Sequence, residues 1–427
     1  MTNACNVTNT TQKRKHSYML TIICAIVFFV LLLLRDTYAV GINKYLFIGI
    51  VCLCAVCMKT DQLIYLFCFL FPLYVGLPGN YLTLVLFARL LFETRRVKSS
   101  SFIVTVAVAA FVFLQNIFMG FTGMVPMMFI VGVIVVMLLF THKQGLKPLP
   151  MVLMYSAGVA SLGFIMLAST LQVYEMTDLL STSFRLGSSS VDYVEEGIMN
   201  VSMDPNFYGS FAIASISLAF PLIFQAGTRP VAKVCLALFV FTQLAVCLIG
   251  LSRAFVVILM VWMLLYLLSR RSIKGTVIAV IAIACIIILF VNFMPDVIET
   301  VLARFDDSDM ATGNGRLTLI AEFWNEWGSS ALTMLFGVGM YNCNVHCMPL
   351  QFLFGGGVVL FLLMVALAFS YRAAFKKKHL SEFLPLIVTF AMLCTVPAGV
   401  MLNYMFPLVL TGLILHISSG QTETEGR

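Results

Sequence analysis

The sequence TVIAVIAIACIIILFVNFM, residues Thr276–Met294, is an apolar run of the length that a membrane-crossing helix needs. It is followed by Pro295–Gly357, which holds the richest collection of polar and glycine residues in an otherwise apolar chain. The next apolar run begins at Phe352. This pattern predicts a membrane protein whose functional residues gather in a segment between two membrane helices.

The composition of the whole chain agrees with this prediction. Of its 427 residues, 61% are hydrophobic and 11% are charged, and the mean hydropathy is +1.01. Soluble domains carry about a quarter charged residues, so a chain of this composition needs a bilayer as its solvent. We expect a single all-α integral membrane domain over residues 1–427 and no separate soluble domain.

Apolar runs bounded by charged residues, polar residues, proline or glycine recur along the chain. About fourteen such runs predict a polytopic bundle of transmembrane helices. The predicted spans are Tyr18–Leu34, Tyr45–Met58, Leu63–Val75, Tyr81–Phe92, Phe102–Met119, Met127–Phe140, Met151–Leu171, Phe207–Ala226, Val234–Gly250, Phe255–Leu268, Thr276–Met294, Phe352–Ser370, Leu384–Met401 and Tyr404–Ile417. Arg35-Asp36 is expected to end the first span, and Ser418–Arg427 is expected to fray. The third and fourth spans are short, and they could be tilted or could share a hairpin around Pro78-Gly79-Asn80.

The 26 Lys and Arg residues indicate the orientation of the spans. With the N-terminus in the cytoplasm and alternating spans, most of these residues fall in cytoplasmic segments. The outer face then keeps Arg35, Lys44, Arg185, Arg253, Arg304 and Arg316. Both termini are expected in the cytoplasm, and the outer face carries two long loops at about residues 172–206 and 295–351. The net charge of +7 therefore reflects topology, and no nucleic-acid partner is expected.

His346 is the one histidine that this topology places on the outer face. An imidazole titrates near neutral pH, so His346 is a candidate general base. The alternative is a loop histidine whose ring bonds only to backbone.

Three outer arginines are candidates for binding phosphate. Arg253 follows Ser252 at an outer helix junction, while Arg185 and Arg316 lie in loops that contain glycine. A guanidinium group matches phosphate oxygens in a bidentate manner and stays charged when it is partly desolvated. The alternative for Arg253 is a side chain that reaches the lipid headgroups.

Asp204-Pro205-Asn206 precedes a predicted span that begins at Phe207. Asn206 could act as the N-cap of that helix, since proline fixes the turn and asparagine is a favoured capping residue. A role of this segment in catalysis is the alternative.

Two further patterns could bind a metal. Asp307-Ser308-Asp309 spells the D-x-D with which many sugar-nucleotide transferases hold a divalent cation, although a solvated acidic loop is the better interpretation. Cys343 and Cys347 flank His346 at helical spacing and could form a zinc site or a disulfide. A zinc site would need a fourth ligand that the sequence does not identify.

Taken together, the outer segments resemble the O-antigen polymerase and O-antigen ligase superfamily of bacterial membrane proteins. The positions that carry the resemblance are, in chain order, Arg185-x-Gly187, Asp204-Pro205-Asn206, Ser252-Arg253-Ala254, Gly315-Arg316, Trp324, Phe336-Gly337-Val338-Gly339, His346 and Gly355–Gly357. The first two are similar to the first outer segment of that family, the third to its Ser-Arg-small junction, and the others to its long outer loop. One departure is Cys347, because the family often has Asn directly after the loop histidine.

The resemblance implies a glycosyltransferase-C-like bundle with a long, partly helical outer loop. It also implies transfer of a growing glycan from undecaprenyl pyrophosphate to a lipid-linked repeat unit on the outer face of the cytoplasmic (inner) membrane. Arg253 and Arg316 would stabilise the leaving pyrophosphate, and His346 would take the proton of the attacking hydroxyl. The other expected substrate-binding residues are Arg185, Asp204, Asn206, Arg304 and Trp324. Arginine can stabilise this leaving group without a metal, so neither a metal nor a cofactor is expected.

Two other functions remain open at this point. An O-antigen ligase would differ only in its acceptor, which would be lipid A-core or a protein. A transporter or flippase of lipid-linked sugars belongs to a different class, but such proteins usually place ionisable groups in the middle of the membrane. For the polymerase, the expected partners are membrane lipid, a chain-length regulator and a flippase.

Overall fold

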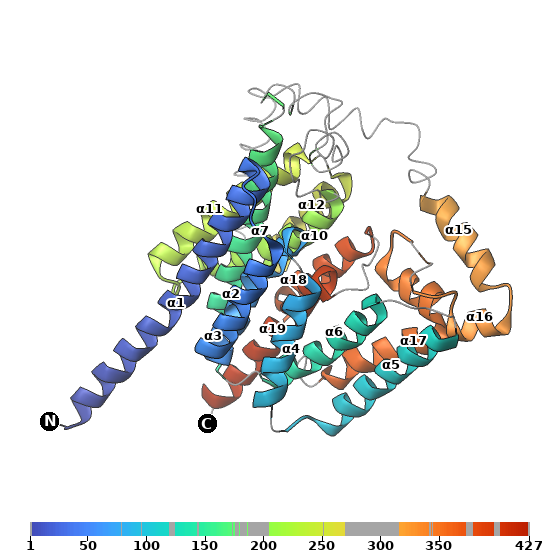
Figure 1. Ribbon diagram of the computed structural model, residues 1–427, viewed down its shortest axis with the longest axis horizontal. Helices are drawn as coiled ribbons and strands as arrows, with labels where there is room; N and C mark the ends of the chain where they lie inside the picture. Colours follow the sequence, from blue (N-terminus) through green and yellow to red (C-terminus); the bar gives the residue numbers. More distant parts are fainter. Residues whose placement is uncertain are drawn as a thin grey trace.

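The computed structural model describes most of the chain, and every regular element in the described part is helical (Figure 1). The described residues are 2–77, 79–94, 96–118, 124–142, 145–172, 174–175, 179, 186, 205–250, 252–269, 316–340, 343, 345–372, 379–396 and 402–425. The predicted span Thr276–Met294, most of the first outer loop and residues 295–315 of the second outer loop lie outside these residues.

The described helices differ in length, and some of them are long enough to cross a membrane. In chain order they are α1 (Thr2–Tyr38), α2 (Lys44–Cys57), α3 (Thr60–Leu70), the 3-10 helix η1 (Pro72–Gly76), α4 (Gly79–Glu93), α5 (Ser99–Phe118), α6 (Met124–Thr141), α7 (Pro148–Thr170), α10 (Pro205–Phe224), α11 (Pro230–Ile249), α12 (Arg253–Ser269), α15 (Arg316–Trp327), α16 (Ala331–Phe336), α17 (Met348–Ser370), α18 (Leu380–Leu393) and α19 (Leu402–Glu425). By length and composition, six of the described helices could cross a membrane, namely α1, α5, α7, α10, α11 and α17. The all-α fold is therefore confirmed for the described residues, and the six candidate spans support a membrane protein, whereas the total of about fourteen spans stays a prediction.

The centre of the bundle is formed by α7 and α10, which are the most buried of these six helices. They pack antiparallel, because Tyr208 near the start of α10 donates a hydrogen bond to the Val159 carbonyl, and Ser215 further along donates to Ser156. Gly163 permits this approach, since a Cβ there would lie 2.3 Å from the Tyr208 hydroxyl oxygen. Small residues and buried polar contacts of this kind hold membrane helices together.

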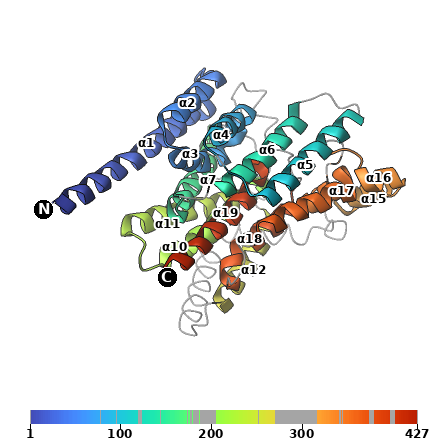
Figure 2. The ribbon, with the colours of Figure 1, turned by 90° about the horizontal axis from the view of Figure 1, so that it is seen from below.

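A second group of helices, α5, α6 and α17, lies beside the centre (Figure 2). Its buried core includes Val108, Val112, Phe129, Met348, Phe352, Leu360, Leu367, Leu393 and Val396. Phe207, in the first turn of α10, packs against this core and so connects the two groups. The helices α15 and α16 pack on α17 and occupy the edge of the molecule in Figure 1.

The helix ends gather into two sets, which we name after a residue in each. At the Arg253 end, α10, α12 and α17 begin, and the Ser169 hydroxyl near the end of α7 donates to the Asp36 carbonyl of α1. At the Glu382 end, the Lys98 amine before α5 donates to the Ser370 carbonyl at the end of α17. Each of these contacts joins two helix ends that the distribution of Lys and Arg assigns to the same side of the membrane. The start of α1 and the end of α19 both point toward the lower left in Figure 1.

One of the two alternatives for the third and fourth spans, a hairpin around Pro78-Gly79-Asn80, is supported by a contact across it. The hydroxyls of Tyr74, in η1, and Thr83, in α4, lie 3.4 Å apart. Pro78 itself lies outside the described residues.

Two helices extend beyond the ends of their predicted spans. Helix α1 continues through Arg35 and Asp36 to Tyr38, because the two side chains form a buried ion pair with contacts of 2.6 and 2.9 Å and neutralise each other. Helix α19 continues to Glu425, so the polar tail from Ser418 is helical rather than frayed over the described residues. A helix needs no apolar side chains to propagate once its first turns are fixed by packing.

Candidate functional site

The first part of the candidate site is a hydrogen bond between the beginnings of α10 and α12. The Ser252 hydroxyl donates to the Asn206 side-chain oxygen at 2.8 Å, and both residues are buried. The Ser252 oxygen also accepts the backbone N–H of Phe255 at 3.3 Å, which makes Ser252 the N-cap of α12. Helix α10 begins at Pro205, one residue before Asn206, so the prediction that Asn206 is an N-cap is wrong.

Arg253 is the first residue of α12 and lies half-buried beside this bond. Each helix carries a partial positive charge at its N-terminus, so α10 and α12 bring two such charges together here. The guanidinium of Arg253 adds a full positive charge to the same place. The result is a cationic environment, the kind of environment that suits an anionic oxygen.

Arg316 also begins a helix, α15, and is half-buried. This helix is attached to α17 by aromatic side chains. The rings of Trp324 and Trp327 each lie 5.9 Å from the ring of Phe354, and the Trp327 indole donates to the Met334 carbonyl at 3.2 Å. Trp324 is 54% exposed, so one face of this predicted substrate-binding residue remains open to a ligand.

The glycines of the long loop pack against one another rather than around an open space. Gly357 has φ 71° and breaks α17 into two parts, 348–356 and 358–370. The backbone N–H groups of Val338 and Gly339 donate to the carbonyls of Phe354 and Gly355 at 2.9 and 3.0 Å. A Cβ on Gly337 would lie 2.3 Å from the Gly355 oxygen, so only glycine allows this contact.

Gln115 completes this junction from the other half of the chain. Its buried side-chain amide donates to the carbonyl of Phe336 and, at 2.8 Å, to that of Gly355. A helix break inside a bilayer is tolerated only when protein groups satisfy the freed backbone. Sequence reasoning missed Gln115 because it lies inside an apolar run, although one amide within such a run is itself a signal.

His346 lies just before α17 and is half-buried, while its neighbour Val345 is fully buried. Cys347 is the N-cap of α17 and lies beside Cys394, at the end of α18. The Cys394 thiol donates a hydrogen bond to the Cys347 sulfur, which lowers the pKa of Cys347 to about 6.

The disulfide that Cys343 and Cys347 could form is absent, and both cysteines are free thiols. Cys343 is buried in the cluster of Trp327 and Phe354, and burial raises the pKa of its thiol to about 12. Among the described residues, no group of three His, Cys, Asp or Glu side chains could hold a metal ion. The proposed zinc site at Cys343 and Cys347 is therefore not formed by these residues.

Phe207 connects the beginning of α10 with the core of α5, α6 and α17. It follows Asn206 directly and packs in the cluster that contains Met348 and Leu393. Met348 comes two residues after His346. Asn206 and His346 are therefore each within two residues of a side chain, Phe207 or Met348, that belongs to or packs against one apolar cluster.

Several predicted site residues lie outside the described part of the chain. These are Arg185, Asp204, Arg304 and the acidic pair Asp307 and Asp309. Their roles stay predictions. Of the expected residues that are described, Asn206 and Arg253 lie together, and Arg316 and Trp324 share α15, which packs on α17 after His346.

Comparison of the chain with models of known protein families, with curated proteins and with solved structures found no match.

Proposed function

We propose that this protein is a membrane polysaccharide polymerase that transfers a growing glycan from undecaprenyl pyrophosphate to a lipid-linked repeat unit. The reaction would take place at the Arg253 end, on the outer face of the cytoplasmic membrane, with both termini in the cytoplasm. The observation that carries the proposal is the Ser252–Asn206 bond, because it joins two helix N-termini beside Arg253. The choice of a polymerase rests on the motifs of the outer segments, which occur in the same order as in the O-antigen polymerase and ligase superfamily.

The proposed chemistry is a single displacement at the anomeric carbon of the donor. The oxygen of an acceptor sugar hydroxyl forms a bond to this carbon as the bond to the pyrophosphate oxygen breaks. His346 accepts the hydroxyl proton, and the pyrophosphate leaves with its extra negative charge. Arg253 and Arg316 favour this step because their attraction to the leaving group grows as that charge develops.

The ends of the helices suit a substrate that is anchored in lipid. The pyrophosphate of such a substrate lies at the membrane surface, at the depth where a membrane helix begins. Trp324, on α15, has an exposed indole. Tryptophan is enriched at the membrane surface in membrane proteins, because its ring is amphipathic. In this proposal Trp324 contacts the sugar next to the pyrophosphate.

One observation favours the second candidate, a transporter of lipid-linked sugars. Transporters often bind their substrates at the ends of broken helices, and α17 is broken at Gly357. However, the carbonyls of Phe354 and Gly355 at this break are already bonded to Val338, Gly339 and Gln115. Because these carbonyls already have protein donors, the break in α17 has a structural role. We therefore rank the transporter below the polysaccharide polymerase.

The test uses purified protein in nanodiscs with a lipid-linked repeat unit as the sole substrate. A polymerase produces a ladder of longer lipid-linked glycans, whereas a ligase produces nothing until lipid A-core is added. A transporter moves the lipid-linked unit across a liposome membrane without making a new glycosidic bond. Absence of both the ladder and the ligated product would contradict the proposed enzyme class.

Arg253 is then compared with Arg229, which directly precedes α11 at the other end of α10. Arg253→Ala should slow polymer formation on the order of 10²-fold, as does removal of one oxyanion donor in other enzymes. Arg253→Lys keeps the charge but loses the bidentate fork, so its rate should lie between those of wild type and Arg253→Ala. Arg229→Ala should act like wild type. Equal effects at the two positions would show that a generic basic residue at a helix start suffices.

A further inference from the structure

Cys347 and Cys394 are far apart in the sequence, but their neighbours pack together in one cluster. Cys347 directly precedes Met348, and Cys394 directly follows Leu393. Met348 and Leu393 belong to the same buried apolar cluster. The hydrogen bond from the Cys394 thiol to the Cys347 sulfur shows that the two side chains are in contact.

The backbone is fixed on both sides of this contact. Cys347 is the N-cap of α17, and its N–H donates to the Val345 carbonyl at 2.7 Å. Cys394 is the C-cap of α18, and its N–H donates to the Phe390 carbonyl at 3.0 Å. A disulfide requires two Cβ atoms about 3.5–4.5 Å apart, so cysteines that already touch can form one without movement of the backbone.

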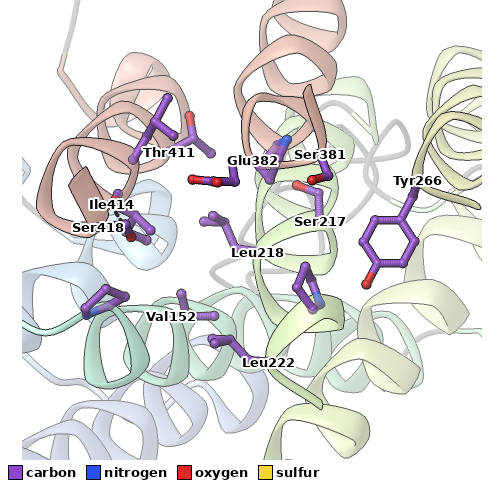
Figure 3. A pocket seen from close by; sticks show the side chains of 14 residues that line it. Val152, Ser217, Leu218, Leu222, Tyr266, Ser381, Glu382, Thr411, Ile414 and Ser418 are labelled. Carbon is purple, nitrogen blue, oxygen red and sulfur yellow. Dashed lines mark hydrogen bonds between the residues drawn. The ribbon is translucent and has the colours of Figure 1, made fainter. Parts of the chain in front are cut away.

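Helix α18 connects this pair of thiols to the centre of the bundle. Ser381 and Glu382, at its start, line a cavity of about 300 Å³ at the Glu382 end (Figure 3). Met392, near its other end, lies against the start of α10, since a Cβ on Gly209 would lie 2.8 Å from the Met392 Cε. A covalent bond at Cys394 would therefore join α17 to a helix that packs on both α10 and α12.

The two sulfurs differ from those of the other described cysteines in access and reactivity. Cys347 and Cys394 are both half-buried, so a solute can reach the pair from the surface. The hydrogen bond from Cys394 lowers the pKa of Cys347 to about 6, which keeps Cys347 largely in its nucleophilic thiolate form at pH 7. Cys347 is therefore the attacking thiol of the pair, and Cys394 is the second, resolving thiol.

Two other pairings are less suited to oxidation. Cys343 is the nearest cysteine to Cys347 in the sequence, but it is 1% exposed and burial raises the pKa of its thiol to about 12. The sulfurs of Cys24 and Cys54 lie 3.6 Å apart, but they lie between α1 and α2, and Cys54 is buried. A water-soluble oxidant does not reach either buried sulfur.

We propose that Cys347 and Cys394 form a reversible disulfide by exchange with a water-soluble disulfide. The Cys347 thiolate attacks one sulfur of the oxidant, whose S–S bond breaks, and the other half of the oxidant leaves as a thiolate. Cys394 then gives its proton to water, and its sulfur attacks the Cys347 sulfur and releases the second half of the oxidant. The protons lost by the two cysteines are taken up by the two leaving thiolates. Two cysteine thiols are thus oxidised to one disulfide, and the oxidant is reduced to two thiols.

The new bond would fix the beginning of α17, next to His346, to the end of α18. It would thereby hold the segment of His346 in place relative to the helices that carry Asn206 and Arg253. The formation of the bond does not depend on the function of the Arg253 end.

The experiment treats the purified, reduced full chain in nanodiscs with oxidised glutathione at pH 7. Remaining thiols are then blocked with N-ethylmaleimide, and the digested protein is analysed by mass spectrometry. The expected result is a linked pair of peptides that contain Cys347 and Cys394, with loss of both free thiols and their return after dithiothreitol. A link from Cys347 to Cys343, glutathione that stays on Cys347, or no reaction at either cysteine would overturn the proposal.

Serine variants assign the two roles. Cys394→Ser removes the resolving thiol, so glutathione should remain attached to Cys347 and the link should be lost. Cys347→Ser keeps a favoured N-cap residue for α17 and should lose both the link and the attached glutathione. Cys24→Ser is the matched control and should form the link to the same extent as the wild type. The same loss in all three variants would overturn the assignment.

Thermal unfolding shows whether the bond fits the native structure. A disulfide that forms without strain restricts the unfolded chain, so the oxidised protein should unfold at a higher temperature than the reduced protein. The difference should disappear in Cys394→Ser. A lower unfolding temperature after oxidation would show that the two cysteines must leave their native positions to react, which would contradict the proposal.

Discussion

The hydroxyl of Ser252 donates a 2.8 Å hydrogen bond to the side-chain oxygen of Asn206, and the two residues are 46 positions apart in the chain. The bond lies where α10 and α12 both begin, and Arg253 follows directly. It therefore sets the position of the arginine relative to two helix N-termini. The proposed binding of a pyrophosphate depends on this arrangement.

Replacement of Ser252 by alanine should destabilise the protein. Ser252→Ala removes the N-cap of α12 and one donor to a buried amide, at a cost of roughly 1–3 kcal/mol in the free energy of unfolding. Ser269→Ala is the control, since this hydroxyl bonds only the Tyr266 carbonyl at the other end of α12. The loss should be smaller in the control when unfolding is measured in bicelles. In the Ser252→Ala protein, the further change Asn206→Ala should lower the free energy of unfolding by less than it does in the wild type, because the two residues share one bond. Strict additivity would contradict the coupling.

Gly337 should be intolerant of a side chain. Its φ is 80°, and a Cβ would lie 2.3 Å from the Gly355 oxygen, so Gly337→Ala should separate the loop from the break in α17. The expected result is a loss of several kcal/mol or failure to fold. Gly49→Ala in α2 is the control, because no atom lies within 4 Å of the added carbon and alanine favours a helix. A folded, stable Gly337→Ala protein would show that the loop contact is unimportant.

Gln115 should contribute more to stability than its neighbour Asn116. Gln115→Met keeps the length of the side chain but leaves the carbonyls of Phe336 and Gly355 without this donor, at a cost of about 1–3 kcal/mol. Asn116→Leu should change little, since Asn116 bonds only the Val112 carbonyl of its own helix. Thermal unfolding of the two variants in the same detergent compares them. Similar melting temperatures would argue against the role of Gln115.

Cys347 should react with alkylating reagents at unusually low pH. Its pKa is lowered from 9.0 to about 6 by the hydrogen bond from Cys394, so the reactive thiolate persists until the pH falls below about 6. Cys394→Ala removes the donor and should raise the pKa of Cys347 toward its ordinary value. Mass spectrometry of the peptide that contains Cys347, after timed alkylation at several pH values, measures this shift. The same pH profile in wild type and variant would contradict the contact.

The class of the protein and the places where many helices begin could be predicted from the sequence. The predicted span Met151–Leu171 corresponds to α7, and Phe207–Ala226 corresponds to α10, with each helix starting slightly earlier at a proline. Hydropathy identifies apolar segments, but proline at the first helical position decides where the backbone turns helical. Residues of the Asp204-Pro205-Asn206 motif and of the Ser252-Arg253 motif are expected to belong to one site, and Asn206 does contact Ser252.

The contact between the loop glycines and the break in α17 could not be predicted from hydropathy. The sequence shows the glycines at 337, 339 and 355–357, but not that two of these segments bond to each other through their backbones. The contact from Gln115 spans 240 positions and leaves no periodic signal. The continuation of α1 past Arg35 and Asp36 was also missed, because adjacent charges predict a helix end unless they are known to pair within the fold.

The most direct test of the central claim is an experimental structure, by cryo-electron microscopy, of the protein in nanodiscs with undecaprenyl pyrophosphate. The account predicts density for the diphosphate at the Arg253 end, in contact with the guanidinium of Arg253 and beside the first turns of α10 and α12. Density for the diphosphate at the Glu382 end, or at a position out of reach of Arg253, would contradict it.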